Sequence, residues 1–148
     1  MNLLAPVSRI MTTDLVTVKP EDKITKVKEI FDEKKIHHIP VVKGKKMVGI
    51  ISKQDFLYFL HGFTNTGKVM GIEALESATC EKIMTTGLAK LESTSRINVA
   101  LEVFKENLFH ALPVDDGEDL VGIITTYDII SRLADEPITL EDYKDYRQ

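Results

Sequence analysis

Apolar residues follow one succession of spacings twice along this chain. The alternating run at Val16–Val18 predicts a short strand that ends at Lys19-Pro20. Apolar residues then recur at helical spacing in both halves of the chain: Ile24, Val27, Ile30 and Phe31, and later Ile97, Ala100, Leu101 and Phe104. Asp22 and Ser95 precede these runs and are good N-cap residue types, so we expect a helix start at each. Each helix should run for about twelve residues and bury one face.

Two apolar runs and a second helix follow each of these helices. Ile39–Val42 predicts a strand entered through a proline, and Gly44 and Gly117 mark the turns that come next. Met47–Ile51 and Leu120–Ile124 are nearly continuous apolar runs, which are typical of buried strands. Ser52 and Thr125 then open a further helix. The sequence therefore predicts a mixed α/β (α+β) fold, with the order strand, helix, strand, strand, helix occurring twice.

The two halves also align residue by residue. Shifting the segment 10–60 by 73 residues places it on 83–133 without a gap, and 19 of the 51 aligned pairs are identical. We divide the chain into a first repeat (7–60), a linker (61–79), a second repeat (80–133) and an acidic tail (134–148). Most of the linker is expected to be loop, with a short helix possible from Lys68 to Ser77. Units this small bury too little surface alone, so the repeats should share a core.

Composition and charge exclude several classes of protein. The chain of 148 residues carries a net charge of −4, with 43% hydrophobic and 28% charged residues, which is ordinary for a soluble protein. It has no long basic run, which argues against nucleic-acid binding. Its single cysteine, Cys80, excludes an internal disulfide and a cysteine-rich zinc site. We see no signal peptide or membrane span, so we expect a cytoplasmic protein.

The end of each repeat carries hydroxyl and carboxylate groups at a fixed spacing. Ser52 and Asp55 in the first repeat align with Thr125 and Asp128 in the second. A hydroxyl residue with an acid three positions later is the pattern of a helix-capping box. The same geometry also suits a nucleotide. A helix N-terminus binds phosphate, and a carboxylate one turn further on can accept both hydroxyls of a ribose. Lys53 adds a charge in the first repeat, and Thr126 takes the aligned position in the second, so both are candidate ligand contacts.

A histidine recurs before the middle strand of each repeat. His37 and His110 each lie three residues before a proline, and each is either a surface residue or a donor to a phosphate oxygen. The adjacent apolar residues are either core or one wall of a purine pocket; these are Ile39, Pro40, Leu112 and Pro113. His38 aligns with Ala111, and neighbouring strand residues face opposite ways, so the His37-His38 pair does not indicate zinc. No catalytic motif is present, and we expect no enzyme.

The motifs Ile-Met-Thr-Thr, His-x-h-Pro-Val and Gly-h-h-Ser/Thr-x-x-Asp, where h is apolar, occur in that order twice. In this the chain resembles a tandem pair of CBS domains (cystathionine β-synthase domains), from Ser8 to Leu133. The resemblance implies two β-α-β-β-α units in a pseudo-twofold pair, called a Bateman module. Each first strand and the segment before it should wrap onto the other unit. Two clefts should lie between the units, and two such pairs commonly form a disc-like homodimer.

The resemblance also implies a ligand and its contacts. In the family the clefts bind AMP, ADP or ATP, and sometimes dinucleotides or S-adenosylmethionine. Asp55 and Asp128 match the ribose-binding acid, and Ser52, Thr125, His37 and His110 match phosphate contacts, with Lys53 assisting in one cleft. Adenine would rest near Ile39, Leu112, Thr17 and Lys90, with Thr13 and Thr86 as weaker candidates. Because Lys53 occurs in one copy only, we expect the first cleft to prefer more phosphate charge.

Two hypotheses of function follow. The first is a regulatory adenine-nucleotide sensor that requires no cofactor and acts in trans, through self-association or on an unidentified protein partner. The second is a scaffold that binds protein, through the acidic tail and the linker, and leaves its clefts empty. A thermal-shift panel of AMP, ADP, ATP, S-adenosylmethionine and NAD separates the two, since a ligand raises thermal stability by mass action.

Overall fold

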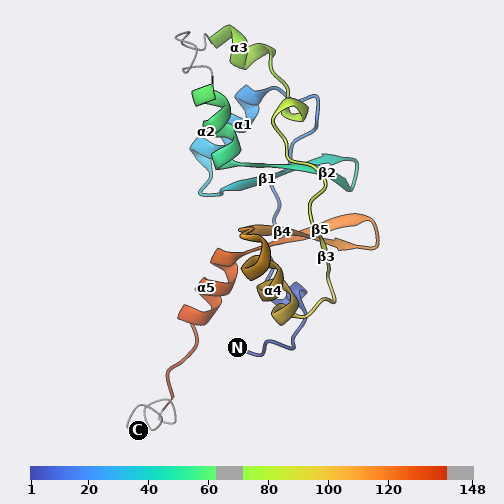
Figure 1. Cartoon of the computed structure of the whole chain (residues 1–148), viewed down its shortest axis with the longest axis vertical. Helices are drawn as coiled ribbons and strands as arrows, with labels where there is room; N and C mark the ends of the chain where they lie inside the picture. The colour runs from blue at the N-terminus through green and yellow to red at the C-terminus, as the bar shows by residue number, and fades with distance from the viewer. Residues whose placement is uncertain (63–71, 140–148) are drawn as a thin grey trace.

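Two similar halves are stacked along the long axis of the molecule (Figure 1). The structure is a computed structural model that describes residues 1–62 and 72–139. Its elements, in chain order, are η1 (Val7–Arg9), α1 (Ile24–Glu33), β1 (His38–Lys43), β2 (Lys46–Ser52), α2 (Lys53–Gly62), α3 (Ile72–Ser77), η2 (Cys80–Lys82), β3 (Leu91–Glu92), α4 (Ile97–Asn107), β4 (Ala111–Asp116), β5 (Asp119–Thr125) and α5 (Thr126–Ala134).

The sheets meet in the middle of the molecule and the helices cover their outer faces (Figure 1). In the first half β1 and β2 form an antiparallel hairpin. In the second half β4 and β5 form the matching hairpin, and β3 pairs with β4 in parallel. The second repeat thus has the predicted strand, helix, strand, strand, helix order. In the first repeat the predicted strand at Val16–Val18 is reduced to a single bridge from Val18 to Val41.

Each half has its own apolar core. The helices and strands contribute to it with the predicted periodicities, because residues on one helix face and on one side of each strand turn inward. The first core contains Val18, Ile24, Val27, Phe31, Ile39, Val41, Ile51, Phe56, Ala78 and Cys80. The second contains Val7, Leu91, Ile97, Ala100, Phe104, Leu112, Val114, Ile124 and Ile129.

The segment before each repeat packs into the other repeat. Val7 is fully buried in the second core, and Cys80, which aligns with it, is fully buried in the first. Burial raises the pKa of the Cys80 thiol to about 11, which leaves it inert at neutral pH. The expected wrapping is therefore right for the preceding segments and wrong for the first strands. Val18 and β3 pair with β1 and β4 of their own repeats, because the chain has returned by then.

The segments that cross into the other repeat, from Ala5 to Thr12 and from Ala78 to Thr85, are called the crossing segments. Backbone pairing fixes both of them at equivalent points. Thr12 exchanges two hydrogen bonds with Ile123 (2.8 and 3.0 Å), and Thr85 exchanges two with Ile50 (2.8 and 3.0 Å). Next to these pairs the chains approach so closely that a side chain on the glycine would displace a methionine. A Cβ atom on Gly49 would lie 2.7 Å from the Met84 sulfur, and one on Gly122 would lie 2.5 Å from the Met11 sulfur. The glycine and the methionine of the repeated motifs thus touch across the interface between repeats.

The crossing segments also satisfy the first helix of each repeat. The Ile24 N–H donates to the Ala78 carbonyl (3.1 Å), and the Ile97 N–H donates to the Ala5 carbonyl (3.0 Å). The predicted N-caps at Asp22 and Ser95 are therefore wrong by one residue. Lys23 and Arg96 occupy the N-cap positions without a side-chain hydrogen bond, since carbonyl groups from the crossing segments serve the free N–H groups instead.

The linker and tail are described only in part. The short linker helix is α3, which packs against α1, while residues 63–71 lie outside the described chain. The acidic residues from 140 onward also lie outside it, so the tail prediction is untested. In the ranges 1–62 and 72–139 no helix is long and apolar enough to span a bilayer.

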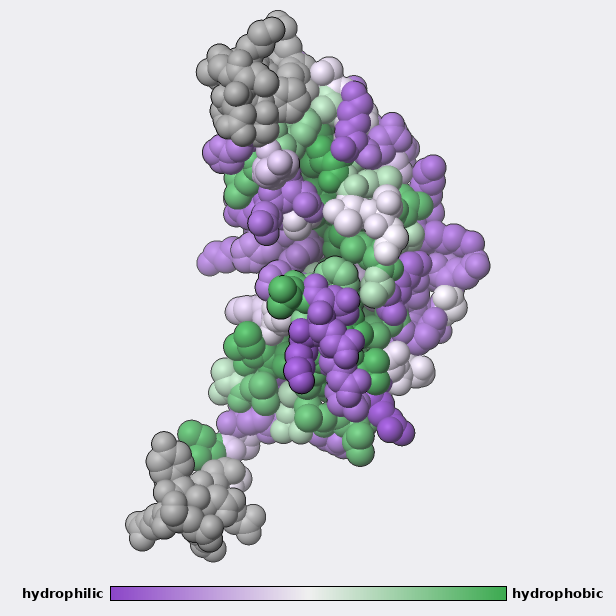
Figure 2. All heavy atoms as spheres, viewed as in Figure 1, coloured by the Kyte–Doolittle hydropathy of each residue, from purple (hydrophilic) through white to green (hydrophobic). Residues whose placement is uncertain are grey.

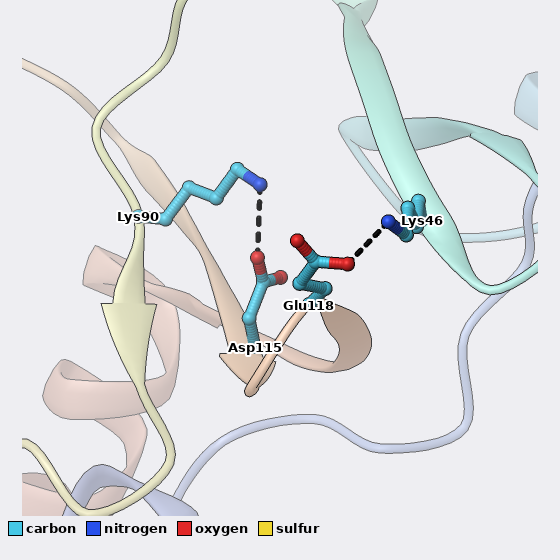
Figure 3. Close-up of polar contacts among 4 residues, drawn as sticks. All are labelled: Lys46, Lys90, Asp115 and Glu118. Atoms are coloured by element: carbon cyan, nitrogen blue, oxygen red, sulfur yellow. Dashed lines mark hydrogen bonds and ion pairs between the residues drawn. The ribbon is translucent and has the colours of Figure 1, made fainter.

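At the far end of the strands the two hairpin turns are joined by charge (Figure 3). Lys46 of β2 pairs with Glu118 in the turn between β4 and β5, and the Leu120 N–H donates to the Lys45 carbonyl at 2.8 Å. Lys90, just before β3, pairs with Asp115 of β4 at 2.9 Å. The crossing segments and the backbone bond link the two repeats, while the exposed Lys46 pair contributes little to the link.

Candidate functional site

A cavity of about 660 Å³ lies between the two repeats, at the start of α2 and α5. Both repeats line it, and so does one crossing segment. From the first half come Thr12, Lys35, Ile36, His37, His38, Ser52, Lys53 and Gln54, and from the second His110, Ile123, Thr125, Thr126, Tyr127 and Asp128. The structure thus brings seven of the predicted site residues into one space: His37, His110, Ser52, Lys53, Thr125, Thr126 and Asp128.

One backbone contact in each repeat brings a histidine to a helix start. The Lys53 N–H donates to the His37 carbonyl at 2.8 Å, and the Thr126 N–H donates to the His110 carbonyl at 3.1 Å. Each bond ties the residue before the middle strand to the first turn of the second helix. The motif histidine and the motif hydroxyl are far apart in sequence, and this contact explains why they line the same cavity.

A capping box begins both of these helices. Asp55 accepts from the Ser52 N–H at 3.0 Å, and its own N–H donates to Ser52 Oγ at 2.9 Å. Asp128 accepts from the Thr125 N–H at 2.7 Å, and its N–H donates to Thr125 Oγ1 at 3.2 Å. The structural interpretation of this motif is therefore correct in both copies. It leaves carboxylate oxygens with further lone pairs for a ligand.

The two carboxylates differ in position. Asp128 lines the cavity, and its Oδ1 atom accepts a hydrogen bond from the Thr12 hydroxyl at 3.1 Å. Asp55 is not among the residues that line it. Thr12 was missed in the sequence, where Thr13 and Thr86 were named instead. Its exact recurrence as Thr85 in the Ile-Met-Thr-Thr motif was the signal that pointed to it.

The remaining predicted residues lie away from the cavity. Ile39, Pro40 and Leu112 are fully buried and Pro113 is buried, so these four are core and not an open purine wall. Thr13 and Thr86 are exposed and Thr17 is partly buried, all outside the cavity lining. Lys90 is held by Asp115, which is only 4% exposed. The structure does not bring these residues to the site.

Three charged or titratable groups were not predicted as part of the site. Lys35 and His38 line the cavity from the first repeat, and Tyr127 from the second. Burial lowers the pKa of His38, and the nearby imidazoles of His37 and His110 lower it further, while Asp55 acts in the opposite direction. His38 carries no repeat signal because Ala111 stands at the aligned position. Among the described residues, no three His, Cys, Asp or Glu side chains are grouped to hold a metal ion.

This arrangement suits an anion joined to a polar, hydroxyl-bearing group. Lys35 and Lys53 bring positive charge, and three imidazoles and two helix starts add hydrogen-bond donors. Asp128 and Thr12 supply oxygen atoms that can accept hydrogen bonds from a ligand. We expected a first cleft that contains Lys53 and prefers phosphate charge, and a second cleft without a lysine. The structure does not support this division. Lys53 of the first repeat lines the same cavity as Thr125 and Asp128 of the second.

Comparison with known proteins now decides the family. The model of the CBS domain matches the chain twice, over residues 7–62 and 80–135. The chain belongs to the CBS domain family. Its two CBS domains match the two repeats found in the sequence, and together they cover most of the chain.

Solved CBS-domain structures share this fold. CBSX2 of Arabidopsis thaliana, in complex with AMP, superposes with a TM-score of 0.73 at 24% identity, covering 88% of this chain and 96% of that one. The CBS domain pair of protein MJ0100, in complex with 5′-methylthioadenosine and S-adenosyl-L-methionine, gives 0.69 at 26% identity, with coverage of 88% and 96%. The likeness shows the fold of this chain, and the bound molecules are those of the two solved proteins.

Curated relatives are much longer proteins. Inosine-5′-monophosphate dehydrogenase of Thermoplasma acidophilum is 29% identical over 124 residues, which are 83% of this chain and 22% of that enzyme. Among the first three such relatives the chain spans between 22% and 29% of their length. The likeness to the dehydrogenase is therefore confined to a small part of the enzyme.

Proposed function

We propose that this CBS pair is a regulatory sensor that binds an adenine nucleotide in the cavity between its repeats. The observation that carries the proposal is the convergence of Lys53, His37 and His110 with Asp128 in one cavity. Its volume of about 660 Å³ lies within the range of small-molecule sites. Cationic and donor groups are what a phosphate requires, and the carboxylate is what a ribose diol requires.

We propose one direction for the nucleotide in this cavity. Its ribose lies at Asp128 and Thr12, whose side chains are joined by a hydrogen bond of 3.1 Å. Its phosphate end lies toward Lys53 at the start of α2, where the backbone dipole favours negative charge, because the start of α5 already holds the Asp128 carboxylate. Such a ligand contacts both repeats, so it favours the orientation in which both sets of groups converge, as a sensor requires.

The ligands of similar proteins narrow the choice. The molecules bound to CBSX2 and MJ0100 all contain adenosine, which makes adenosine the shared part. S-adenosylmethionine carries a positive sulfonium group, which is unfavourable beside Lys35 and Lys53. AMP, ADP and ATP place negative charge there instead. We therefore propose an adenylate over S-adenosylmethionine as the ligand.

Thermal shift and calorimetry with AMP, ADP, ATP, S-adenosylmethionine and NAD test this function. We expect the adenylates to raise the melting temperature of the chain. Lys53→Ala should weaken adenylate binding about tenfold, because it removes a charge from the phosphate end. Lys43→Ala is the matched control, since Lys43 is an exposed lysine at the far end of β1. A response to none of the adenylates, or an equal loss in both variants, would contradict the proposal.

We expect this sensor to form a homodimer and to act through a second copy of the chain. Apolar side chains lie exposed on both helices that start at the cavity: Leu57 and Tyr58 on α2, and Tyr127, Ile130 and Leu133 on α5. Figure 2 shows apolar surface over the half of the molecule that contains α4 and α5, beside a hydrophilic strip. Leu57 and Ile130 align in the repeat, and a two-fold dimer uses one patch on both copies.

Analytical ultracentrifugation tests the homodimer. We expect the wild-type chain to sediment as a dimer and the double variant Leu57→Asp/Ile130→Asp as a monomer, because a charge inside an apolar interface is costly. Val99→Asp on α4 is the control, since Val99 is also exposed but lies on another helix. A wild-type chain that stays monomeric at high concentration would contradict the dimer.

One observation favours the scaffold alternative. Both motif carboxylates already serve in capping boxes, so their recurrence has a structural reason that needs no ligand. In that case the cavity stays empty and the chain acts by binding protein. The panel of nucleotides separates the two functions, because a scaffold shows no thermal shift with any of them.

A further inference from the structure

His38 lines the cavity from the first repeat, and Ala111, which has only a methyl group, stands at the aligned position in the second. It begins β1 and pairs with Ser52 of β2, while its counterpart Ala111 begins β4 and pairs with Thr125. Directly paired residues project from the same face of a hairpin. His38 and Ser52 both line the cavity, whereas Ile39, the next residue, points into the core.

The surroundings of His38 contain two lysines, two carboxylates and two further imidazoles. His37 precedes it, His110 faces it from the start of β4, and Lys35 and Lys53 line the same cavity. The negative groups are Asp55 of α2, which acts on His38 from outside the cavity lining, and Asp128 of α5. Burial and the neighbouring imidazoles lower the pKa of His38, so its free imidazole is mainly neutral at pH 7. An anion in this cavity would attract the imidazolium form and so offset part of the cost of burying its charge.

We propose that His38 couples ligand charge to proton uptake: its imidazole binds a proton as a phosphate group enters the cavity. The cavity then prefers ligands with more phosphate charge as the pH falls. This inference rests on the proposed function, since it assigns a role to one residue of the same site. It makes His38 a residue that determines specificity between nucleotides differing only in phosphate number.

The direction follows from linkage between proton and ligand. If the bound state holds His38 at a higher pKa than the free state, affinity rises as the pH falls through the bound value toward the free value. Each unit between the two values corresponds to a tenfold change in affinity, roughly. ATP places more charge near the imidazole than AMP, so the gain should be larger for ATP.

Isothermal titration calorimetry of the full chain tests the inference. AMP, ATP and sodium tripolyphosphate are titrated between pH 6 and pH 8, in pairs of buffers with different ionisation enthalpies, so that protons taken up per bound ligand are measured. The variants are His38→Ala, which introduces the residue of the second repeat, and His38→Gln, which keeps a polar side chain. His61→Ala is the control, since His61 is an exposed histidine near the end of α2 and does not line the cavity.

Phosphate groups themselves titrate near pH 6, so the decisive quantity is the difference between wild type and the His38 variants. We expect wild type and His61→Ala to take up more protons with ATP than either His38 variant. Their preference for ATP over AMP should rise several-fold from pH 8 to pH 6, and much less so without His38. Nucleotide binding with equal proton numbers in all four proteins would overturn the inference and leave the proposed function intact.

The other outcomes are also separate. Tripolyphosphate binding with His38-dependent proton uptake, but no binding of AMP or ATP, would overturn the proposed function and retain the proton-coupled anion site. Binding of neither nucleotide nor tripolyphosphate would overturn both. Loss of folding in His38→Ala is not expected, because Ala111 occupies the same strand position in the second repeat.

Discussion

Single residues in this site carry structural and functional duties together, and Asp128 is the best example. Its carboxylate caps α5 and also faces the cavity, whereas the aligned Asp55 caps α2 outside the cavity lining. The two aspartates therefore form a matched pair, because both cap a helix and only Asp128 lines the cavity.

We expect Asp55→Ala to lower the free energy of unfolding by about 1 kcal/mol, because it removes a helix cap. Asp128→Ala should cost at least as much, because it also removes the acceptor for the Thr12 hydroxyl. Only Asp128→Ala should also weaken adenylate binding. Urea denaturation and calorimetry measure the two effects separately. Equal losses of affinity in both variants would show that Asp128 has no special contact with the ligand.

The titration of His38 predicts how stability depends on pH without ligand. Burial and neighbouring imidazoles lower the pKa of His38 in the folded chain, so the unfolded chain binds more protons below the usual value of 6.5. The contribution to stability is thus fully present above that pH and is lost as the pH falls through it. We expect urea denaturation from pH 7.5 to 5.5 to show a smaller decline for His38→Ala than for wild type or His61→Ala. Identical declines in the three proteins would refute this.

The contacts of Gly49 with Met84 and of Gly122 with Met11 predict coupling between specific pairs. Gly49→Ala should cost about 1–3 kcal/mol, because its Cβ atom would overlap the Met84 side chain. Met84→Ala should remove much of that cost, whereas Met11→Ala in the same background should not. A double-mutant cycle measures this coupling energy, and additivity for the Gly49–Met84 pair would contradict the close contact.

At the scale of elements, the apolar periodicity predicted the helices and hairpins, and the repeat made each prediction twice. It failed where the other half of the chain decides the outcome. Asp22 and Ser95 do not cap their helices. The first N–H groups of these helices, on Ile24 and Ile97, donate instead to the carbonyl groups of Ala78 and Ala5. The predicted strand at Val16–Val18 forms only the bridge from Val18 to Val41, whereas the aligned segment of the second repeat forms β3.

The site was predictable where its residues recur, and at Lys53 and Thr126, which directly follow the recurring hydroxyl residues. His37, His110, Ser52, Thr125 and Asp128 stood out by repetition, and the structure brings these five into one cavity. Repetition also misled, because Asp55 was expected to match Asp128 and lies outside the lining. His38 and Lys35 could not be found in this way, since a residue that breaks the pseudo-symmetry gives no repeat signal. The core positions of Ile39 and Leu112 depend on which strand face turns inward.

At the scale of the whole molecule, the sequence repeat is not the unit of packing. Each core contains a residue from the segment that precedes the other repeat, so neither core is complete when the other half unfolds. Such mutual dependence favours a single transition over two independent ones.

Val41→Ala and Val114→Ala test this cooperativity, because these valines align in the repeat and are both fully buried. Each should cost about 2 kcal/mol for two buried methyl groups. Scanning calorimetry should show one transition in wild type and in both variants, lowered by similar amounts. Two transitions, with only one shifted in each variant, would contradict the interdependence of the cores.

Because Val7 packs in the second core, it can be buried only late during synthesis on the ribosome. Cys80 emerges after nearly all of its neighbours in the first core, so that core can close as soon as it appears. Val7 emerges first, yet its partners extend from Leu91 to Ile129. At about 5–20 residues per second, this N-terminal segment waits for roughly 5 to 20 seconds with its apolar side chains open to chaperones.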